Sequence, residues 1–391
     1  MATLKIEKIG GEGVSSRERH AKAYSQTMSE ILSDIVKSIN SADRLRNIFA
    51  WAFEQLKIDA EHIKDAVADV QAFADYFRVI RDCHKPYDYK GGKANPNEDL
   101  LIAEAERLLN VRDVVERQIG YLSVKYPDAY AFCRKLMKIL FNYKEFCEGG
   151  SLRRNESTGE FSWGGSLTGD LAGWGAFAFL KQLNVRYCPY CNAETVYAIS
   201  VQKGGKSVNI RSALDHFVPH AEYPFLGISL YNLVPACYRC NSQIKEQRNA
   251  CLPGCAHPYI HDLYAGYRFK VRTKDVLRLG YDETNPQFKL EIKKARNCES
   301  DQAKRLMVDF FDLGGVYNEL YIPEAYDIIR RIRLFTPAYR EMMRNSGLRR
   351  VSVSRALYGC DLVQSHIRKF RLSKLTIDLK RQFEAGAKKG V

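Results

Sequence analysis

Two cysteine pairs of the Cys-x-x-Cys type are spaced as zinc ligands often are. Cys188 and Cys191 enclose the letters PY, and Cys237 and Cys240 enclose YR. Each pair can present two thiolates from one tight turn, and four thiolates complete a tetrahedral zinc site with no open coordination position. A redox-active motif would use one pair alone, so the sequence predicts a structural Zn²⁺. Because such a closed site cannot activate water, catalytic chemistry must come from other residues.

Between and after these pairs lie residues that could bind a second, catalytic metal ion. SVNIRSALDHF predicts a strand running into Asp215 and His216, and YRCNSQIKEQR predicts a helix with Asn241 and Lys245 on one face. If zinc holds the helix start near the strand end, Asn241 faces Asp215. These oxygen ligands suit Mg²⁺ or Mn²⁺ bound jointly with a phosphate. His216 points the other way along an extended strand and could face a water molecule.

Each of these residues also has a structural interpretation. Asp215 could cap a turn, Asn232 could be an ordinary loop residue, and Asn241 could cap the helix. Taken singly, each structural interpretation is as good as the catalytic one. Their joint occurrence within one cysteine-framed segment favours the catalytic assembly.

The chain has eleven cysteines, so at least one is unpaired. Cys251 and Cys255, in CLPGCAHPYIH, could form a second metal site with His257 or His261. No matching second pair is visible, which favours the interpretation of these four as loop residues. The remaining cysteines outside the two pairs are interpreted mostly as small buried apolar residues.

The segment from Tyr187 to Lys245 resembles a known family, the HNH endonucleases with the ββα-metal fold, in their zinc-binding CxxC…CxxC form. The resemblance rests on CPYC, DHFVP, NLVPAC and CxxCNxxxK in this order and spacing. Within that family, DHFVPHAEYP…NLVPACYRCNSQIK followed by HPYI resembles the PtuB-like nucleases of bacterial anti-phage systems, Septu and the retrons that carry the same nuclease. Those nucleases work beside an ATPase partner.

The resemblance implies a role for each matching residue. His216 would be the general base that takes a proton from the attacking water. Asp215 and Asn241 would hold one divalent ion against the scissile phosphate. Asn232 would orient the His216 loop by hydrogen bonding to the backbone, and Lys245 would contact a phosphate.

Two positions depart from the family's usual pattern. Asn241 stands where many members have His. In this the chain resembles a known variant of the family, which has Asn at the same position. His220 stands where PtuB-like relatives usually have Lys. His220 is therefore a candidate substrate contact, with a surface histidine of no special role as the alternative.

Basic residues concentrate toward the C-terminal end of the chain. The 391 residues carry a formal net charge of +14, and sixteen Lys or Arg stand against four Asp or Glu between Arg330 and Val391. This excess indicates a surface for DNA, although a solvated basic helix face is an equally good interpretation of the segment alone. Without a long apolar segment or a secretory signal, we expect no membrane association and a cytoplasmic location.

Apolar periodicity and glycine content divide the chain into four expected regions. Residues 1–147 predict a helical region for partner docking or regulation, and residues 148–180 a glycine-rich connection. Residues 181–262 would be the HNH nuclease module with the four-cysteine zinc site. Residues 263–391 predict short strands, in YRFKVRT and FKLEIKKA, followed by basic helices. The expected fold is mainly α with an embedded small ββα-metal zinc module, and α+β overall.

The favoured function is a metal-dependent HNH endonuclease that hydrolyses DNA phosphodiester bonds with little sequence preference of its own. The resemblance implies an anti-phage defence effector. One rival is a non-catalytic zinc-stapled nucleic-acid-binding or scaffold protein, for which His216→Ala would leave every activity intact. The other is a stand-alone restriction or homing nuclease, which would need a sequence-reading module, and none is recognisable in the sequence.

Overall fold

The structure is a computed structural model. It describes residues 120–121, 123–125, 127–154, 157, 161–166, 175–183, 185–229, 232–251, 253–259, 261–272, 288–295, 301–347 and 349–387. Most of the helical region expected over residues 1–147 lies outside the described residues. So do the last two lysines of the basic tail.

Contacts between Cα atoms group the described residues into two compact units. One unit consists of residues 183–217 and 234–387, and the other of residues 120–182 and 218–233, with the gaps given above. Both helices and small two-stranded sheets are present, so the expected mixed α+β class is confirmed. The expected boundaries between the four regions stay a prediction. None of the helices in the described residues is long and apolar enough to cross a membrane.

The unit with residues 120–182 contains helices and a two-stranded sheet. The elements described in this unit are α7 (Pro127–Leu140), α8 (Tyr143–Glu148), β1 (Gly150–Arg154), β2 (Phe161–Ser166), α9 (Ala176–Gln182) and the 3₁₀ helix η2 (Pro224–Leu226). Helix α8 begins where the side chain of Asn142 accepts hydrogen bonds from the backbone N–H groups of Lys144 and Glu145. It ends at Gly149, whose φ of 82° is the left-handed conformation that glycine tolerates. The glycine-rich segment then forms the antiparallel pair β1–β2.

The other unit carries the two cysteine pairs and the C-terminal helices. Its strands and central helical turns are β3 (Ala198–Lys203), β4 (Lys206–Arg211), β5 (Ala213–His216), β6 (Leu233–Ala236, which starts one residue before the unit), η4 (Arg239–Lys245), β7 (Tyr267–Val271) and β8 (Leu290–Lys294). Its later helices are α11 (Gln302–Lys304), η5 (Arg305–Phe310), α12 (Leu313–Leu320), α13 (Ile322–Leu334), α14 (Pro337–Asn345), α15 (Arg350–Tyr358), η6 (Gln364–Lys369) and α16 (Ser373–Ala387). Both η4 and η5 are π-helical, and η6 is a 3₁₀ helix.

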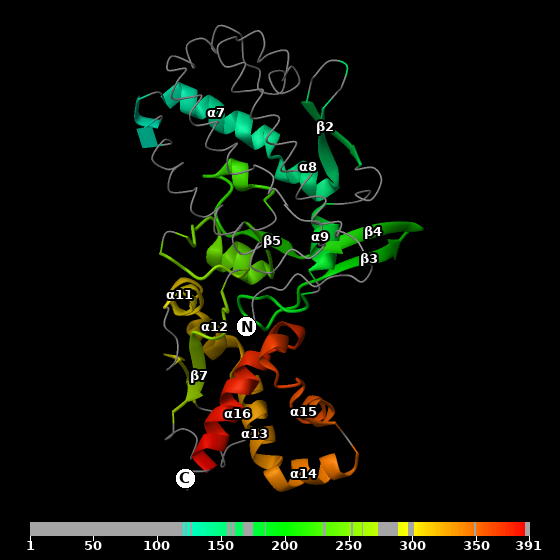
Figure 1. Cartoon of the computed structure of the whole chain (residues 1–391), viewed down its shortest axis with the longest axis vertical. Helices are drawn as coiled ribbons and strands as arrows, with labels where there is room; N and C mark the ends of the chain where they lie inside the picture. Colours follow the sequence, from blue (N-terminus) through cyan, green and yellow to red (C-terminus); the bar gives the residue numbers. More distant parts are fainter. Residues whose placement is uncertain are drawn as a thin grey trace, which may run out of the picture. The chain divides into compact units, whose positions relative to one another are not determined.

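The strand expected before Asp215 is present as two strands. β4 pairs with β3 in a hairpin (Figure 1) that turns at Gly204 and Gly205, both with positive φ. After a break at Ser212, β5 carries Asp215 and His216 and pairs with β6. The helix expected after the second cysteine pair is present as η4. Two strands and a helical turn thus follow one another around the second cysteine pair.

The short strands expected after residue 260 are confirmed as β7 and β8, which pair antiparallel. Alternate residues of β7 are buried, as a strand with one face on the core requires. Helix α16 packs against β7 and α13 (Figure 1). Its Asp378 and Gln382 side chains accept hydrogen bonds from the backbone N–H groups of Phe269 and Val271, each at 3.0 Å. These side chains satisfy backbone groups that a two-stranded sheet leaves unpaired.

Asn192, directly after the first cysteine pair, joins that turn to the start of α16. Its backbone has a φ of 53°, a left-handed conformation that Asn adopts more readily than most residues. Its amide nitrogen donates to Ile367 O at 2.7 Å and to Phe370 O at 3.3 Å. Its side-chain oxygen accepts from the Lys374 N–H at 3.0 Å, and its carbonyl accepts from the Leu372 N–H at 2.8 Å. The C-terminal helix and the cysteine turn are therefore one packed assembly.

We expect Asn192→Gly to lower the free energy of unfolding by about 2–4 kcal/mol, because it permits the same φ but removes several buried hydrogen bonds. The matched control is Asn209→Ala on the exposed face of β4, which should change stability by less than about 0.5 kcal/mol. Urea denaturation followed by circular dichroism measures both. Equal, small effects in the two variants would show that Asn192 does not hold the assembly together.

Candidate functional site

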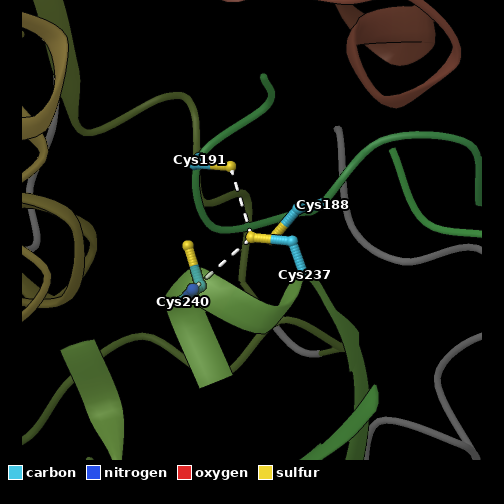
Figure 2. Close-up of side chains that lie close together, drawn as sticks. All are labelled: Cys188, Cys191, Cys237 and Cys240. Carbon is cyan, nitrogen blue, oxygen red and sulfur yellow. Dashed lines mark hydrogen bonds between the residues drawn. The ribbon is translucent and has the colours of Figure 1, made fainter. Parts of the chain in front are cut away.

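The four cysteines of the two pairs meet in one buried cluster. Figure 2 shows their side chains turned toward one another, from the turn before β3 and from the start of η4. Their sulfur atoms all lie within 4.8 Å of each other, and the Cys191 and Cys237 sulfurs are 3.9 Å apart. A tetrahedral zinc with Zn–S bonds of about 2.3 Å places its sulfurs about 3.8 Å apart, so the donor set and its size fit Zn²⁺. Four buried cysteines that could hold a structural zinc are thus confirmed.

The electrostatics of the cluster also suit a cation. Hydrogen bonds from the Cys188, Cys237 and Cys240 thiols hold the pKa of Cys191 well below its usual range. Burial raises the pKa of Cys188 well above its usual range. The backbone N–H of Cys240 points at the Cys237 sulfur, 3.4 Å away. A bound Zn²⁺ would compensate the negative charge that four buried thiolates would otherwise accumulate.

Three buried tyrosines hold the first cysteine turn in place, and the sequence analysis assigned a role to none of them. Tyr264 donates from its hydroxyl to Pro189 O at 2.7 Å, and Tyr317 donates to Cys191 O at 2.6 Å. Tyr190, inside the CPYC turn, donates to the Asp215 carboxylate at 2.7 Å. Only the position of Tyr190 between two cysteines was visible in the sequence; the other two tyrosines come from segments far along the chain.

Asp215 is the residue on which three segments converge. Its Oδ2 accepts from Tyr190 of the cysteine turn, and its Oδ1 lies 3.0 Å from the Lys245 ammonium at the end of η4. Lys245 also donates to His216 O at 2.7 Å. Asp215 and Lys245 are each only 1 % exposed, so this is a buried ion pair. Burial raises the pKa of Asp215, although Lys245 and Tyr190 both favour its charged form.

His216 follows Asp215 at the end of β5 and retains 8 % exposure, at the edge of the buried core. The next residue, Phe217, packs its ring edge against His257 with 4.5 Å between ring centroids. Asn232 is buried and hydrogen-bonds to the backbone of Val218 in both directions, accepting from its N–H at 2.8 Å and donating to its carbonyl at 2.9 Å. The backbone on the C-terminal side of His216 is therefore fixed by a side chain, as the resemblance implies for Asn232.

Three further residues expected at the site are Asn241, Lys245 and His220. Asn241 lies inside η4 and not at its cap, and its amide donates to Ser242. No hydrogen bond joins Asn241 to Asp215 in the part of the chain that the structure describes. Lys245 is buried against Asp215 and does not present its ammonium to solvent. His220 is exposed, with its ring 6.0 Å from that of Tyr143.

The alternative metal site around Cys251 and Cys255 has no support in the described residues. The four-cysteine cluster is the only group of three or more metal-ligating side chains found there. The imidazoles of this segment serve its local fold instead: His261 Nδ1 accepts from the His257 N–H at 2.9 Å, and His257 Nδ1 accepts from the Tyr259 N–H at 3.3 Å. These contacts are those expected of the loop residues that the sequence favoured.

Comparisons of the chain with protein-family models, with curated proteins and with solved structures found no match. Function must therefore be argued from the site itself.

Cys240→Ser should remove bound zinc and lower the melting temperature by at least about 10 °C, because a structural zinc site contributes folding free energy directly. Cys255→Ser is the matched control, since Cys255 is also buried but stands outside the cluster. Elemental analysis by mass spectrometry should find one zinc per chain in the wild type and in Cys255→Ser. Wild-type protein purified from zinc-supplemented cells with no bound metal would contradict the assignment.

Lys245→Met should destabilise the protein by about 3–5 kcal/mol, because it leaves the buried Asp215 carboxylate without its counter-charge. Adding Asp215→Asn should restore part of that loss, since the double variant buries no unpaired charge. Lys206→Met, on the exposed β4 strand, is the control and should have little effect. Strictly additive losses from the two substitutions in chemical denaturation would show that Asp215 and Lys245 are not energetically coupled.

Proposed function

We propose that this protein is a metal-dependent endonuclease of the HNH type that hydrolyses phosphodiester bonds in DNA. The observation that carries the proposal is the convergence of the cysteine cluster, the β5 end with Asp215 and His216, and η4 on one buried ion pair. The resemblance of CPYC, DHFVP and CxxCNxxxK supplies the reaction class. A structural cluster of this kind brings a histidine and a carboxylate together on a rigid frame, which is what a hydrolytic site needs.

His216 is the proposed general base. Its own carbonyl accepts from Lys245, and Asn232 fixes the backbone of Val218 two residues later. The main chain at His216 and just beyond it is therefore held at two points, which limits the positions that the imidazole can take. A histidine is suited to the task because its proton affinity lies near neutral pH. In the proposed reaction, an imidazole nitrogen of His216 takes the proton of the water that attacks phosphorus. The bond between phosphorus and the 3′ oxygen breaks, and the leaving oxygen takes up a proton from solvent.

Asp215 and Asn241 are the proposed ligands of a catalytic divalent ion. Carboxylate and amide oxygens match the hard ligands that Mg²⁺ and Mn²⁺ prefer. Such an ion, when bound, would stabilise negative charge at the scissile phosphate. The Asp215 carboxylate already faces one cation, the Lys245 ammonium at 3.0 Å. We propose that Lys245 must leave Asp215 for the metal to bind, so the described arrangement corresponds to a resting form.

A second function is favoured by the same ion pair. Because both oxygens of Asp215 are engaged and the residue is buried, it can serve as a purely structural connection between the cysteine turn and η4. The protein would then be a zinc-stapled nucleic-acid-binding or scaffold protein without hydrolytic activity. The two functions differ in their dependence on the His216 imidazole, which only the first uses as a general base.

The biological setting remains part of the proposal. By its resemblance to PtuB-like nucleases, we propose an effector of anti-phage defence that works with an ATPase partner. DNA would be gripped through backbone phosphates by the basic C-terminal helices, where Arg331, Arg333 and Arg344 are exposed. Affinity carried by such contacts falls steeply as salt concentration rises.

Incubation of the purified protein with supercoiled plasmid and Mg²⁺ or Mn²⁺ should produce nicked or linear DNA. His216→Ala should lower the rate by about 10²–10⁴-fold, the usual contribution of a general base. His366→Ala is the control: it removes another histidine of the same unit, which contacts Asp361, and it should retain wild-type activity. Melting curves confirm that both variants are folded.

Cleavage that persists unchanged in His216→Ala would contradict the assigned base. A folded, zinc-loaded wild type that binds plasmid equally well with and without divalent ions and never cuts it would favour the non-catalytic function.

A further inference from the structure

A polar cavity lies among the C-terminal helices beside the first cysteine turn. It has a volume of about 400 Å³, within the range typical of small-molecule sites. Its walls come from the residues before Cys188, from α13, from the end of α15 and from the segment that enters α16. All of these segments belong to the same compact unit as Asp215 and His216. Its charged lining residues are Arg186, Arg331, Lys369, Arg371, Glu324 and Asp327.

We infer that this cavity binds the phosphate group of a nucleotide, either free or within a polynucleotide strand. Four cationic side chains face two carboxylates in its lining, which leaves an excess of positive charge. One carboxylate, Glu324, is already engaged by Arg371 at 3.0 Å. Within the described residues no ion pair involves Arg186 or Arg331, both of which are exposed. These two guanidinium groups are therefore the ones placed to bind a phosphate, which arginine does with paired hydrogen bonds.

The aromatic lining distinguishes a nucleotide from a simple anion. Tyr187, Tyr358 and Phe370 all line the cavity. The Tyr358 hydroxyl accepts from Arg340, and the Phe370 ring lies under the Arg355 guanidinium, 5.2 Å away. Tyr187 is half-buried and directly follows Arg186, whose guanidinium lies over the Tyr187 ring, 5.9 Å from its centroid. In such a pair the arginine can bind a phosphate while the tyrosine ring stacks on the adjacent base. This combination is common in single-strand binding sites.

Leu372 lines the cavity and is hydrogen-bonded to the residue that follows the first cysteine pair. The backbone N–H of Leu372 donates to Asn192 O at 2.8 Å.

 The φ of Leu372 is 53°. This left-handed conformation is unfavourable for Leu, so the Leu372 backbone is held by its contacts. Its carbonyl accepts from the Thr376 hydroxyl at 3.0 Å. A ligand in the cavity therefore rests on backbone that Asn192 connects directly to the cysteine turn.

The choice of a nucleotide rests on the proposed nuclease function. The cavity would give that nuclease a second contact with the substrate strand. A nuclease with little sequence preference needs phosphate and stacking contacts away from the scissile bond to hold its substrate. The binding of a phosphate in the cavity can nevertheless be measured without any cleavage.

The test uses full-length, zinc-loaded protein carrying His216→Ala, so that no substrate is cut during the measurement. The probe is a fluorescein-labelled single-stranded DNA oligonucleotide followed by fluorescence anisotropy, with unlabelled AMP as the competitor. Arg186→Gln and Arg331→Gln should each weaken binding of the strand about tenfold or more, as expected for loss of a charged hydrogen bond. The dependence of log K on log salt concentration should become shallower by about 0.7 for each phosphate contact removed.

Lys206→Gln is the control, because it removes an exposed positive charge from β4 of the same unit but does not line the cavity. It should change the affinity less than twofold. Competition by AMP that is lost in Arg186→Gln and Arg331→Gln would identify a free nucleotide as a ligand. Strand binding that depends on the two arginines without competition by AMP would identify a polynucleotide.

Equal affinities for the strand and for AMP in the two cavity variants and in Lys206→Gln would overturn the inference. That result is distinct from failure of the proposed function. If the wild type cuts DNA but the cavity variants bind the strand normally, only the proposed cavity site is excluded. If the wild type never cuts DNA but its strand binding depends on Arg186 and Arg331, only the proposed nuclease activity is excluded.

Discussion

Burial of four cysteine sulfurs within 4.8 Å of one another is the constraint on which the rest of the structure depends. With its cysteines ionised, such a cluster is unfavourable without a cation, because buried thiolates repel one another. A tetrahedral zinc bound by the four sulfurs would compensate this charge and would join two segments that are far apart in the sequence. Tyr190 of the first cysteine turn donates to Asp215, and Lys245 at the end of η4 pairs with the other oxygen of the same carboxylate.

The C-terminal helices belong to the same frame. Asn192 binds the start of α16, and Tyr317 of α12 donates to the carbonyl of Cys191. The cavity between α13 and the entry to α16 is therefore built on backbone that the cysteine turn fixes. Changes at the cluster should consequently reach the cavity through hydrogen bonds, without any need for movement of whole units.

The sequence predicted the features that depend on local pattern. Cysteine spacing predicted the cluster, alternation predicted β7 and β8, and the polar segment after Cys237 predicted the helical turn η4. It did not predict the burial of Lys245 against Asp215, because a lysine in a polar segment is ordinarily solvated and only its tertiary partner changes that. Asn192 and Tyr317 were missed for the same reason: their partners lie more than a hundred residues away. Long-range contacts of this kind leave no periodic signal in a single sequence.

X-ray absorption at the zinc K-edge of the purified protein tests the central claim most directly, because it reports the ligands of the metal and their distances. The account predicts four sulfur ligands at about 2.3 Å and no nitrogen or oxygen neighbour in the first coordination shell. A shell that contains imidazole nitrogen or water oxygen, or a protein that binds no zinc at all, would contradict it.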